Sequence, residues 1–452
     1  MTRQAPLPRF VPAFVCLAVF ACVAPALGQS SSDPADTSAQ HQHMHMSAAD
    51  DLFPPREASG TSWLPDVTPM FGANRDWSGW TVMLHGSVFP QFLYEPANPH
   101  RTGGFSEHQF SVVNWGMLQA RRRSGEARIG FRAMISLEPW TLRDCGYISY
   151  LASGEMCEGD TIHDRQHPHD LFMELAADYD RRLRGTWRWQ IYGGLSGEPA
   201  LGPVSFPHRI SAMLNPIAPI SHHWMDATHI SFGVMTAGAY DQRWRIEGSL
   251  FNGREPDENR ADFDFGPLDS FSGRVTFLPN ERFAMQVSAG HLEEAELEFA
   301  PQPRNDVNRV TASVTYHRPI AQNGIWASTL AYGVNSGHVI IPADEFDAST
   351  QALLFESSLA LRDTHTFFGR AEVVEKPAED LHAHEFARSI FTVAKLQAGY
   401  VRELQPWRGV RFGVGGTASI SIVPQDLASR YDGRVAPGFG VFVSLRPRRH
   451  AM

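Results

Sequence analysis

Apolar and polar residues alternate one by one along most of this chain after Trp80. In Arg243–Phe251 the even-numbered positions are apolar or glycine, whereas positions 245, 247 and 249 are Arg, Glu and Ser. Arg309–Tyr316 and Asp170–Tyr179 show the same pattern, with Met173 on the apolar face of the second segment. A period of two is the spacing of an extended strand, which turns successive side chains to opposite faces. The pattern therefore predicts strands with one apolar and one polar face.

About sixteen such segments follow one another, and the connections between them are alternately short and long. Arg122–Gly125 is a short turn, whereas Pro139–His167, Ser196–Ala227 and residues 336–350 are long connections. This rhythm predicts an all-β fold, a transmembrane antiparallel up-and-down β-barrel of about sixteen strands formed by residues 80–452. Both ends of the barrel fall with the short turns, which predicts periplasmic turns and extracellular loops.

The polar faces would line the lumen, and a barrel of this size is expected to hold water rather than a packed core. The alternative is a soluble β-sandwich or β-propeller with one solvated face, but neither explains the alternation of short and long connections. The last segment fits a barrel because Phe439, Val441, Val443 and Leu445 share one face. The chain then runs on through Pro447–Met452 instead of ending on an aromatic residue.

The amino-terminal residues have the composition of an export signal. Arg3 and Arg9 precede the apolar run Phe10–Pro25, and small residues lead up to Gly28. This order predicts a signal peptide over residues 1–28. The alternative is an uncleaved anchor, although the run is shorter than the roughly 20 residues that a membrane-spanning helix needs. No run of about 18 apolar residues follows, so the sequence predicts no further helical membrane span.

Residues 29–79 are rich in Ser, Asp, Ala, Pro and Gln and lack periodicity, which predicts a disordered tail on the periplasmic side. The tail holds imidazole and thioether side chains at His41, His43, Met44, His45 and Met46. These ligand types suit copper, and Met favours Cu(I). The alternative is a polar tail whose His and Met residues bind nothing.

The chain carries a formal charge of -10, which becomes about -12 once Arg3 and Arg9 leave with the signal peptide. An acidic exported chain argues against nucleic acid as a partner. The expected partners are outer-membrane lipid and small solutes or metal ions, and the sequence leaves a homo-oligomer open.

Four cysteines are present, and Cys16 and Cys22 fall within the signal peptide. Cys145 and Cys157 remain, close in sequence in an exported chain, which predicts a disulfide that closes a loop. Two free thiols are the alternative.

Two dense groups of candidate ligands sit where alternating segments begin. The first group is the octet from His163 to Asp170, with three imidazoles, two carboxylates and one guanidinium, and the second lies between His208 and His229. On the predicted topology both groups lie on neighbouring long loops, near one sector of the barrel rim. The candidate metal ligands are His163, His167, His169, Asp170, His208, His222, His223, Asp226 and His229.

Pro168 pushes His167 toward an extended conformation, so the imidazoles of His167 and His169 are expected to share a face. With a carboxylate or a third imidazole from the second group they would suit Zn or Cu(II). The alternative is that these side chains hydrogen-bond the backbone and hold the loops in shape. Catalysis is a weaker alternative, since a Ser-His-His run at residues 221–223 has no supporting spacing and no known catalytic motif occurs. We therefore predict neither a catalytic residue nor an enzyme.

Several segments carry a resemblance to known sequences. They are His167–Asp170, Gly197–Pro203, Phe206–Arg209, Asn215–Trp224 and Asp226–Ile230. Together they are similar to a group of uncharacterised proteobacterial outer-membrane proteins, which implies a barrel over most of the chain after Trp80 and no established activity. The run His41–Met46 separately resembles the Met- and His-rich leader regions of copper-resistance outer-membrane proteins, a similarity limited to these few residues.

Two functions follow as hypotheses. The first is a porin-like channel in the outer membrane of a Gram-negative cell, which passes small solutes by passive diffusion with selectivity from lumen Arg and carboxylate side chains. The alternative is a copper- or zinc-binding outer-membrane protein that serves metal tolerance, with the tail in the periplasm and the rim histidines outside. A hydrolase carried by the barrel is a third and weaker hypothesis.

Overall fold

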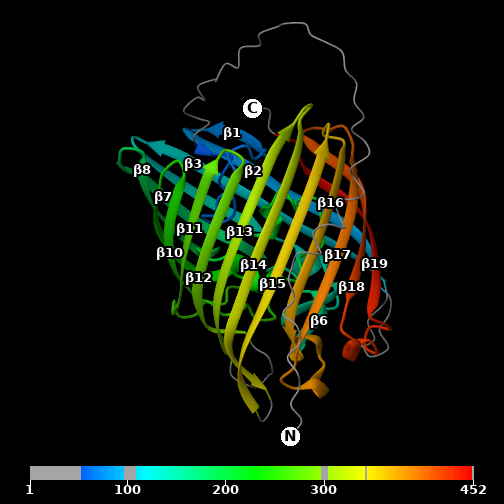
Figure 1. The fold of residues 1–452 in the computed structure, drawn as a ribbon. Helices are drawn as coiled ribbons and strands as arrows, with labels where there is room; N and C mark the ends of the chain where they lie inside the picture. The colour runs from blue at the N-terminus through cyan, green and yellow to red at the C-terminus, as the bar shows by residue number, and fades with distance from the viewer. Residues whose placement is uncertain (1–51, 96–107, 297–303, 342–343, 450–452) are drawn as a thin grey trace. The chain divides into compact units, whose positions relative to one another are not determined.

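Sixteen antiparallel strands close into a barrel in the computed structural model (Figure 1), which describes residues 52–95, 108–296, 304–341 and 344–449. Successive barrel strands pair with one another, and the last strand pairs with the first to close the ring. The barrel strands are β2 (Trp80–Tyr94), β3 (His108–Ser124), β4 (Ala127–Ile135), β7 (Phe172–Arg184), β8 (Trp187–Gly197), β9 (Ser231–Tyr240), β10 (Trp244–Phe251), β11 (Ser270–Asn280), β12 (Phe283–Glu296), β13 (Asn305–Ile320), β14 (Gly324–Ile341), β15 (Asp344–Leu361), β16 (His365–Pro377), β17 (Ile390–Glu403), β18 (Val410–Ile422) and β19 (Val435–Pro447). The predicted all-β antiparallel barrel and its number of strands are confirmed.

The short turns gather at one end of the barrel, called the turn end, and the longer connections at the other, called the loop end. Shorter elements lie outside the ring: β1 (Ala73–Trp77), α1 (Glu138–Thr141), β5 (Tyr147–Cys157), β6 (Asp160–Gln166), η4 (Phe206–His208), α2 (His222–Met225), η5 (Ala227–His229), η6 (Glu379–Leu381), η7 (His384–Phe386) and η8 (Gln425–Leu427). Within the described ranges, no helix has the length and hydrophobicity that crossing a membrane demands.

The two faces of each strand differ as the alternation predicts. In β10, Ile246 and Leu250 are 52% and 54% exposed, whereas Glu247 and Ser249 are 6% and 4% exposed. The apolar side chains therefore point outward and the polar side chains point into the lumen.

The connection between β14 and β15 differs from the prediction of a long loop at residues 336–350. The two strands continue through this region, and Ile341 pairs with Asp344. Figure 1 shows the resulting hairpin extending beyond its neighbours. The ladder continues where the hydrophobic alternation fades, because pairing between strands uses backbone groups that every residue other than proline supplies.

Met173 also departs from the predicted alternation. Ile135 of β4 pairs with Phe172, and Met134 pairs with Glu174, so Met173 is an extra residue in a β-bulge. The bulge turns Met173 inward, where it is 1% exposed, although the sequence places it on the apolar outer face. A local pattern cannot reveal a bulge, because the extra residue depends on the register of the partner strand.

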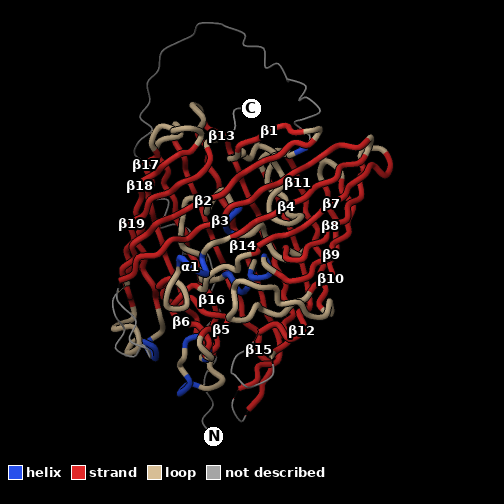
Figure 2. The backbone as a smooth tube through the Cα atoms, turned by 180° about the vertical axis from the view of Figure 1, so that it is seen from behind, coloured by secondary structure: helices blue, strands red, loops and turns tan. Residues whose placement is uncertain are grey.

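Folded protein occupies the lumen, which corrects the expectation of an open, water-filled interior. Three segments enter it, and Figure 2 shows loops and short helices within the ring of strands. They are the N-terminal insert (residues 52–72), the hairpin insert between β4 and β7 (residues 136–171) and the central insert between β8 and β9 (residues 198–230). Each insert supplies hydrogen-bond partners to polar side chains on the inner wall.

The N-terminal insert is held by arginines of the wall. Arg121 on β3 donates a hydrogen bond to the carbonyl of Leu52 at 2.8 Å. Arg132 on β4 donates to the carbonyl of Gly60 at 2.6 Å. These bonds use backbone groups, so they leave no periodic signature in the sequence.

The prediction of a disordered tail is therefore wrong for residues 52–79, which are ordered by contacts with the barrel and by β1. The predicted signal peptide (residues 1–28) and residues 29–51, which include the run His41–Met46, lie outside the described residues. What the sequence predicts for those parts stays a prediction.

The hairpin insert contains α1 and the paired strands β5 and β6. The predicted disulfide between Cys145 and Cys157 is confirmed, with 5.8 Å between the two Cα atoms. Gln109 on β3 donates a hydrogen bond to the carbonyl of Gly146 at 2.9 Å, and so fastens the hairpin to the wall beside the disulfide.

Gly333 on β14 lets the central insert approach the wall, because a Cβ atom there would lie 2.1 Å from the carbonyl oxygen of Trp224. We expect Gly333→Ala to lower the free energy of unfolding by about 1–3 kcal/mol, since the insert would have to shift. Gly116→Ala on β3 is the control, because its Cβ would meet nothing within 4 Å. Denaturant unfolding in detergent, followed by tryptophan fluorescence, measures the difference, and equal stabilities for both variants would contradict the packing described.

Candidate functional site

The central insert crosses the lumen and is fastened to the wall on several strands. Its hydrogen bonds join Gly202 to Ser288 (2.8 Å), Arg209 to Glu356 (2.8 Å), Asn215 to Gln397 (2.6 Å), Ser221 to Glu372 (2.7 Å) and Trp224 to Thr350 (2.8 Å). These wall partners belong to β12, β15, β16 and β17. Because they lie on separate strands, the insert forms a bridge across the interior.

Arg209 is the central fastening of this bridge. Its guanidinium is 1% exposed and lies 2.6 Å from Asp226 within the insert and 2.8 Å from Glu356 on β15. Burial by itself would raise the pKa of Asp226, but Arg209, His222 and His229 together outweigh burial and hold that pKa below its usual range. Asp226 therefore stays ionised at neutral pH and can accept further hydrogen bonds.

Five imidazoles meet beside this ion pair, and we call them the imidazole cluster. His167 and His169 follow β6, His222 and His223 lie in α2, and His229 lies in η5. The ring centroid of His222 lies 5.1 Å from His229, 5.5 Å from His223 and 6.1 Å from His167, and His169 lies 5.4 Å from His229. The two groups of candidate ligands thus meet, and they do so buried inside the barrel.

Each ring of the cluster has a partner that fixes its orientation. The pairs are His167 Nε2 with Glu155 (3.3 Å), His169 Nδ1 with Glu138 (2.9 Å), His222 Nδ1 with Asp226 (2.9 Å), His223 Nδ1 with Glu255 (3.0 Å) and His229 Nδ1 with the carbonyl of Asp226 (2.8 Å). A hydrogen bond donated from Nδ1 leaves Nε2 available as a metal ligand. Within the described residues, Nε2 of His169 and Nε2 of His229 are buried without a hydrogen-bond partner.

Burial also governs protonation of the cluster. It lowers the pKa of His222 and holds the pKa values of His167 and His229 well below the ordinary value. Burial acts on His169 in the same direction, but the carboxylates of Glu138, Asp170 and Glu155 together outweigh it and raise the pKa of His169. A neutral imidazole binds metal directly, whereas a protonated one must first release its proton, so metal binding at His169 would compete with protons more strongly than at the other rings.

The cluster is not a preformed coordination sphere. In the part of the chain that the structure describes, sets of three or more donor atoms of His, Cys, Asp or Glu within 4.8 Å of one another occur at His291, Glu293 and Asp306 and at Asp257, Asp262 and Asp264. Both sets lie at the loop end and include exposed carboxylates, which are common without a metal. A metal ion in the imidazole cluster would therefore require its rings to turn toward one another.

Three of the predicted ligands lie apart from the cluster or are otherwise engaged. His163 stacks on His382 with 3.7 Å between ring centroids. His208 lies toward the turn end, 5.8 Å from His85. Asp170 lies 3.6 Å from Arg260, and burial raises its pKa to about 8. The predicted ligands therefore do not form a single site.

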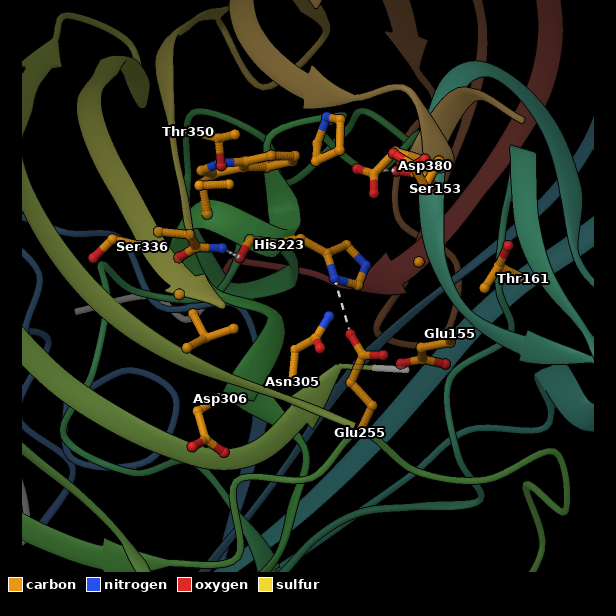
Figure 3. Close-up of a pocket in the computed structure, with 18 of the residues that line it drawn as sticks. Ser153, Glu155, Thr161, His223, Glu255, Asn305, Asp306, Ser336, Thr350 and Asp380 are labelled. Carbon is orange, nitrogen blue, oxygen red and sulfur yellow. Dashed lines mark hydrogen bonds and ion pairs between the residues drawn. The ribbon is translucent and has the colours of Figure 1, made fainter. Parts of the chain in front are cut away.

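A cavity on the loop-end side borders the cluster, and His223 and Glu255 lie 3.0 Å apart in its lining (Figure 3). Among the described residues no Lys or Arg lines this loop-end cavity, whereas five carboxylates do. They belong to Glu155, Glu255, Asp306, Glu379 and Asp380. Arg260 pairs with Glu155 and Lys376 pairs with Asp380, so three of the five carboxylates have no such Lys or Arg partner in the described residues at these distances, and this excess of negative charge favours cations.

Further cavities lie toward the turn end, and His208 borders two of them. The larger, called the turn-end cavity, lies between the N-terminal insert, β2, β3 and the central insert, and its lining includes Met70, Met83, His85, His208 and Met213. A smaller cavity is lined by Met134, Met173, Glu198, His208 and His229, among others. His208 therefore borders both cavities, and His229 links the smaller one to the imidazole cluster.

The sequence did not reveal the residues that orient the cluster. Glu138, Glu155 and Glu255 come from separate parts of two connections and resemble any other loop carboxylate. Phe206 packs against His169, His222 and His229, with centroid distances of 5.5 to 5.9 Å. Its only signal was its place in the Phe-Pro-His-Arg segment that carries the resemblance.

Glu198 is a buried carboxyl in the smaller cavity, and burial raises its pKa from 4.5 to about 7. A carboxyl whose pKa is raised by folding makes the folded state lose stability as pH rises from about 4 through about 7. We therefore expect Glu198→Gln to exceed the wild type in unfolding free energy by about 1–3 kcal/mol at pH 8.5, and to match it near pH 4. Denaturant unfolding at both pH values measures this, with Glu281→Gln at an exposed turn as control; the same pH dependence in both variants would refute the assignment.

Comparisons with known proteins find structural similarity but do not identify a family. Neither a protein-family model nor a curated protein sequence matches the chain. The outer membrane channel DcaP of Acinetobacter baumannii is 10% identical over 83% of this chain and 100% of that chain, with a TM-score of 0.46. The anion-selective porin of Comamonas acidovorans (9%, 81% and 99%, TM-score 0.48) and OmpF of Salmonella typhi (9%, 83% and 100%, TM-score 0.48) are also similar. At these identities the similarity concerns the fold alone.

Proposed function

We propose that this chain is a porin-like protein of the outer membrane, with its barrel across the bilayer and its lumen as a route for small solutes. The outer face of the barrel supports this proposal. Exposed apolar side chains on widely separated strands include Phe131, Ile191, Leu250, Val287, Val310, Phe367 and Val441. A closed barrel also satisfies its backbone hydrogen bonds internally, as a lipid environment requires. The side of the membrane on which the turns lie and the oligomeric state stay predictions of the sequence.

The observation that carries the proposal is that cavities on two sides of the imidazole cluster border it. The loop-end cavity reaches His223, and the smaller cavity on the other side reaches His229. His222 contacts both rings, at 5.5 Å and 5.1 Å between centroids. In the proposed route His222 stands at the narrowest point, and the carboxylates of the loop-end cavity make small cations the preferred solutes.

We expect wild-type protein in planar bilayers to conduct far less than an open sixteen-stranded porin, because three inserts occupy the lumen. His222→Ala should raise the conductance several-fold, since it removes the ring between the two cavities. His365→Ala is the control, because His365 shares the outward-facing positions of Phe367 on β16. If the wild type, His222→Ala and His365→Ala all fail to conduct, the channel proposal is wrong.

A second candidate function is the binding of zinc or copper in the imidazole cluster, in the service of metal tolerance. The buried Nε2 atoms of His169 and His229, which have no hydrogen-bond partner in the described residues, favour it. The carboxylate behind His169 resembles the outer partners that orient metal-bound imidazoles. The tail run His41–Met46 lies outside the described residues and adds nothing to this argument.

Glu138→Gln tests the second candidate without removing a ligand. Glu138 orients His169, so its replacement should weaken zinc binding by about 10–100-fold while the fold persists. The parent for this test is the full chain with His41→Ser, His43→Ser and His45→Ser in its tail. Calorimetric zinc titration in detergent compares this parent with the same protein that also carries Glu138→Gln. Unchanged affinity, or no stoichiometric zinc in the parent, would rule out a metal site in the cluster.

A further inference from the structure

The turn-end cavity differs from the imidazole cluster in its chemistry. Three thioethers and two imidazoles line it, from Met70, Met83, Met213, His85 and His208. The three methionines come from the N-terminal insert, β2 and the central insert. Methionine commonly fills irregular gaps in a core. Here Met70 and Met83 pack beside Leu52 and Phe53, and Met213 packs beside Ile210. All three methionines also line a cavity that His85 and His208 border, so thioether and imidazole side chains from separate segments face the same space.

We propose that the turn-end cavity binds a soft monovalent metal ion, with Cu(I) as the ion that its donors suit. Thioether sulfur selects Cu(I) over harder ions, and neutral imidazole nitrogen is compatible with it. The proposal stands on this cavity alone and depends on neither the channel nor the zinc site.

His208 is the imidazole best placed to act as a ligand. Its ring packs against Trp115 at 4.9 Å and faces His85 at 5.8 Å. Neither of its ring nitrogens has a hydrogen bond to any residue that the structure describes.

His85 is held differently. Its Nε2 lies 3.3 Å from the amide nitrogen of Gln119, which also donates to the sulfur of Met117 at 3.4 Å. This contact fixes the ring of His85 beside the cavity. Binding through Nε2 would require the Gln119 amide to turn away, whereas Nδ1 is not engaged by that contact.

The charges around the cavity favour a monovalent soft ion over a hard divalent ion. Glu57 is the single carboxylate among the described residues that line it, and it is already paired with Arg121 and Arg128. Arg446, the one lining cation in that set, is paired with Glu403. Magnesium and calcium prefer several oxygen ligands that include carboxylates, and the one lining carboxylate is already paired with arginines.

The test uses the full chain with the tail donors replaced in every form, by His41→Ser, His43→Ser, Met44→Leu, His45→Ser and Met46→Leu. Anaerobic titration of Cu(I) against a chromophoric chelator should give one ion per chain. X-ray absorption should show both sulfur and nitrogen neighbours around the ion. The chain with only these tail substitutions is the parent, and its number of bound Cu(I) ions is the reference value for the variants.

The triple variant Met70→Leu, Met83→Leu and Met213→Leu keeps the side-chain volume and removes the sulfur atoms. It should bind Cu(I) at least tenfold more weakly and lose the sulfur signal. His208→Ala should also weaken binding, while the double variant Met235→Leu and Met285→Leu, on the exposed outer face, should bind like the parent. Migration on unheated gels confirms that each barrel is folded.

Two results would overturn the proposal. One is the absence of stoichiometric Cu(I) binding in the folded parent. The other is a sulfur signal that survives the triple substitution, because the ion would then be bound elsewhere in the chain.

Discussion

A single buried guanidinium, that of Arg209, organises the interior of this barrel. It pairs with Glu356 on the wall and with Asp226 in the central insert. Asp226 in turn orients His222 through its carboxylate and His229 through its carbonyl. Removing one partner from a buried ion pair typically costs about 3–5 kcal/mol, because the other charge is left uncompensated. The anchoring of the insert and the orientation of two imidazoles therefore depend on the same charges.

The width of the barrel explains why the inserts matter. In a sixteen-stranded barrel the opposite walls are too far apart for their side chains to fill the space. The inner wall nevertheless presents buried arginines, and Arg121, Arg132 and Arg274 each donate to a backbone carbonyl of an insert. A buried charge without partners is costly. The inserts supply the acceptors that water would otherwise provide, so wall and inserts are complementary in polarity.

The chemistry of the side chains changes along the lumen. Carboxylates dominate the loop-end cavity, imidazoles gather at its inner limit, and thioethers join imidazole at the turn end. Oxygen donors suit hard cations, nitrogen suits zinc and Cu(II), and sulfur suits Cu(I). Each zone is built where different inserts meet, so none of them exists in the bare cylinder. This order of donors connects the proposed passage of cations with the proposed binding of metal ions.

The sequence by itself determined the strands, their number and the face that most residues present, because a two-residue period is a local property. It also predicted the disulfide between Cys145 and Cys157, because the other two cysteines fall within the predicted signal peptide. It could not place the long connections, since a loop rich in His, Asp and Arg has the same composition whether it extends into solvent or folds into the lumen. Only the tertiary structure decided that, through contacts such as the one between Arg209 and Glu356, which are 147 positions apart. No local pattern encodes a hydrogen bond between residues that distant.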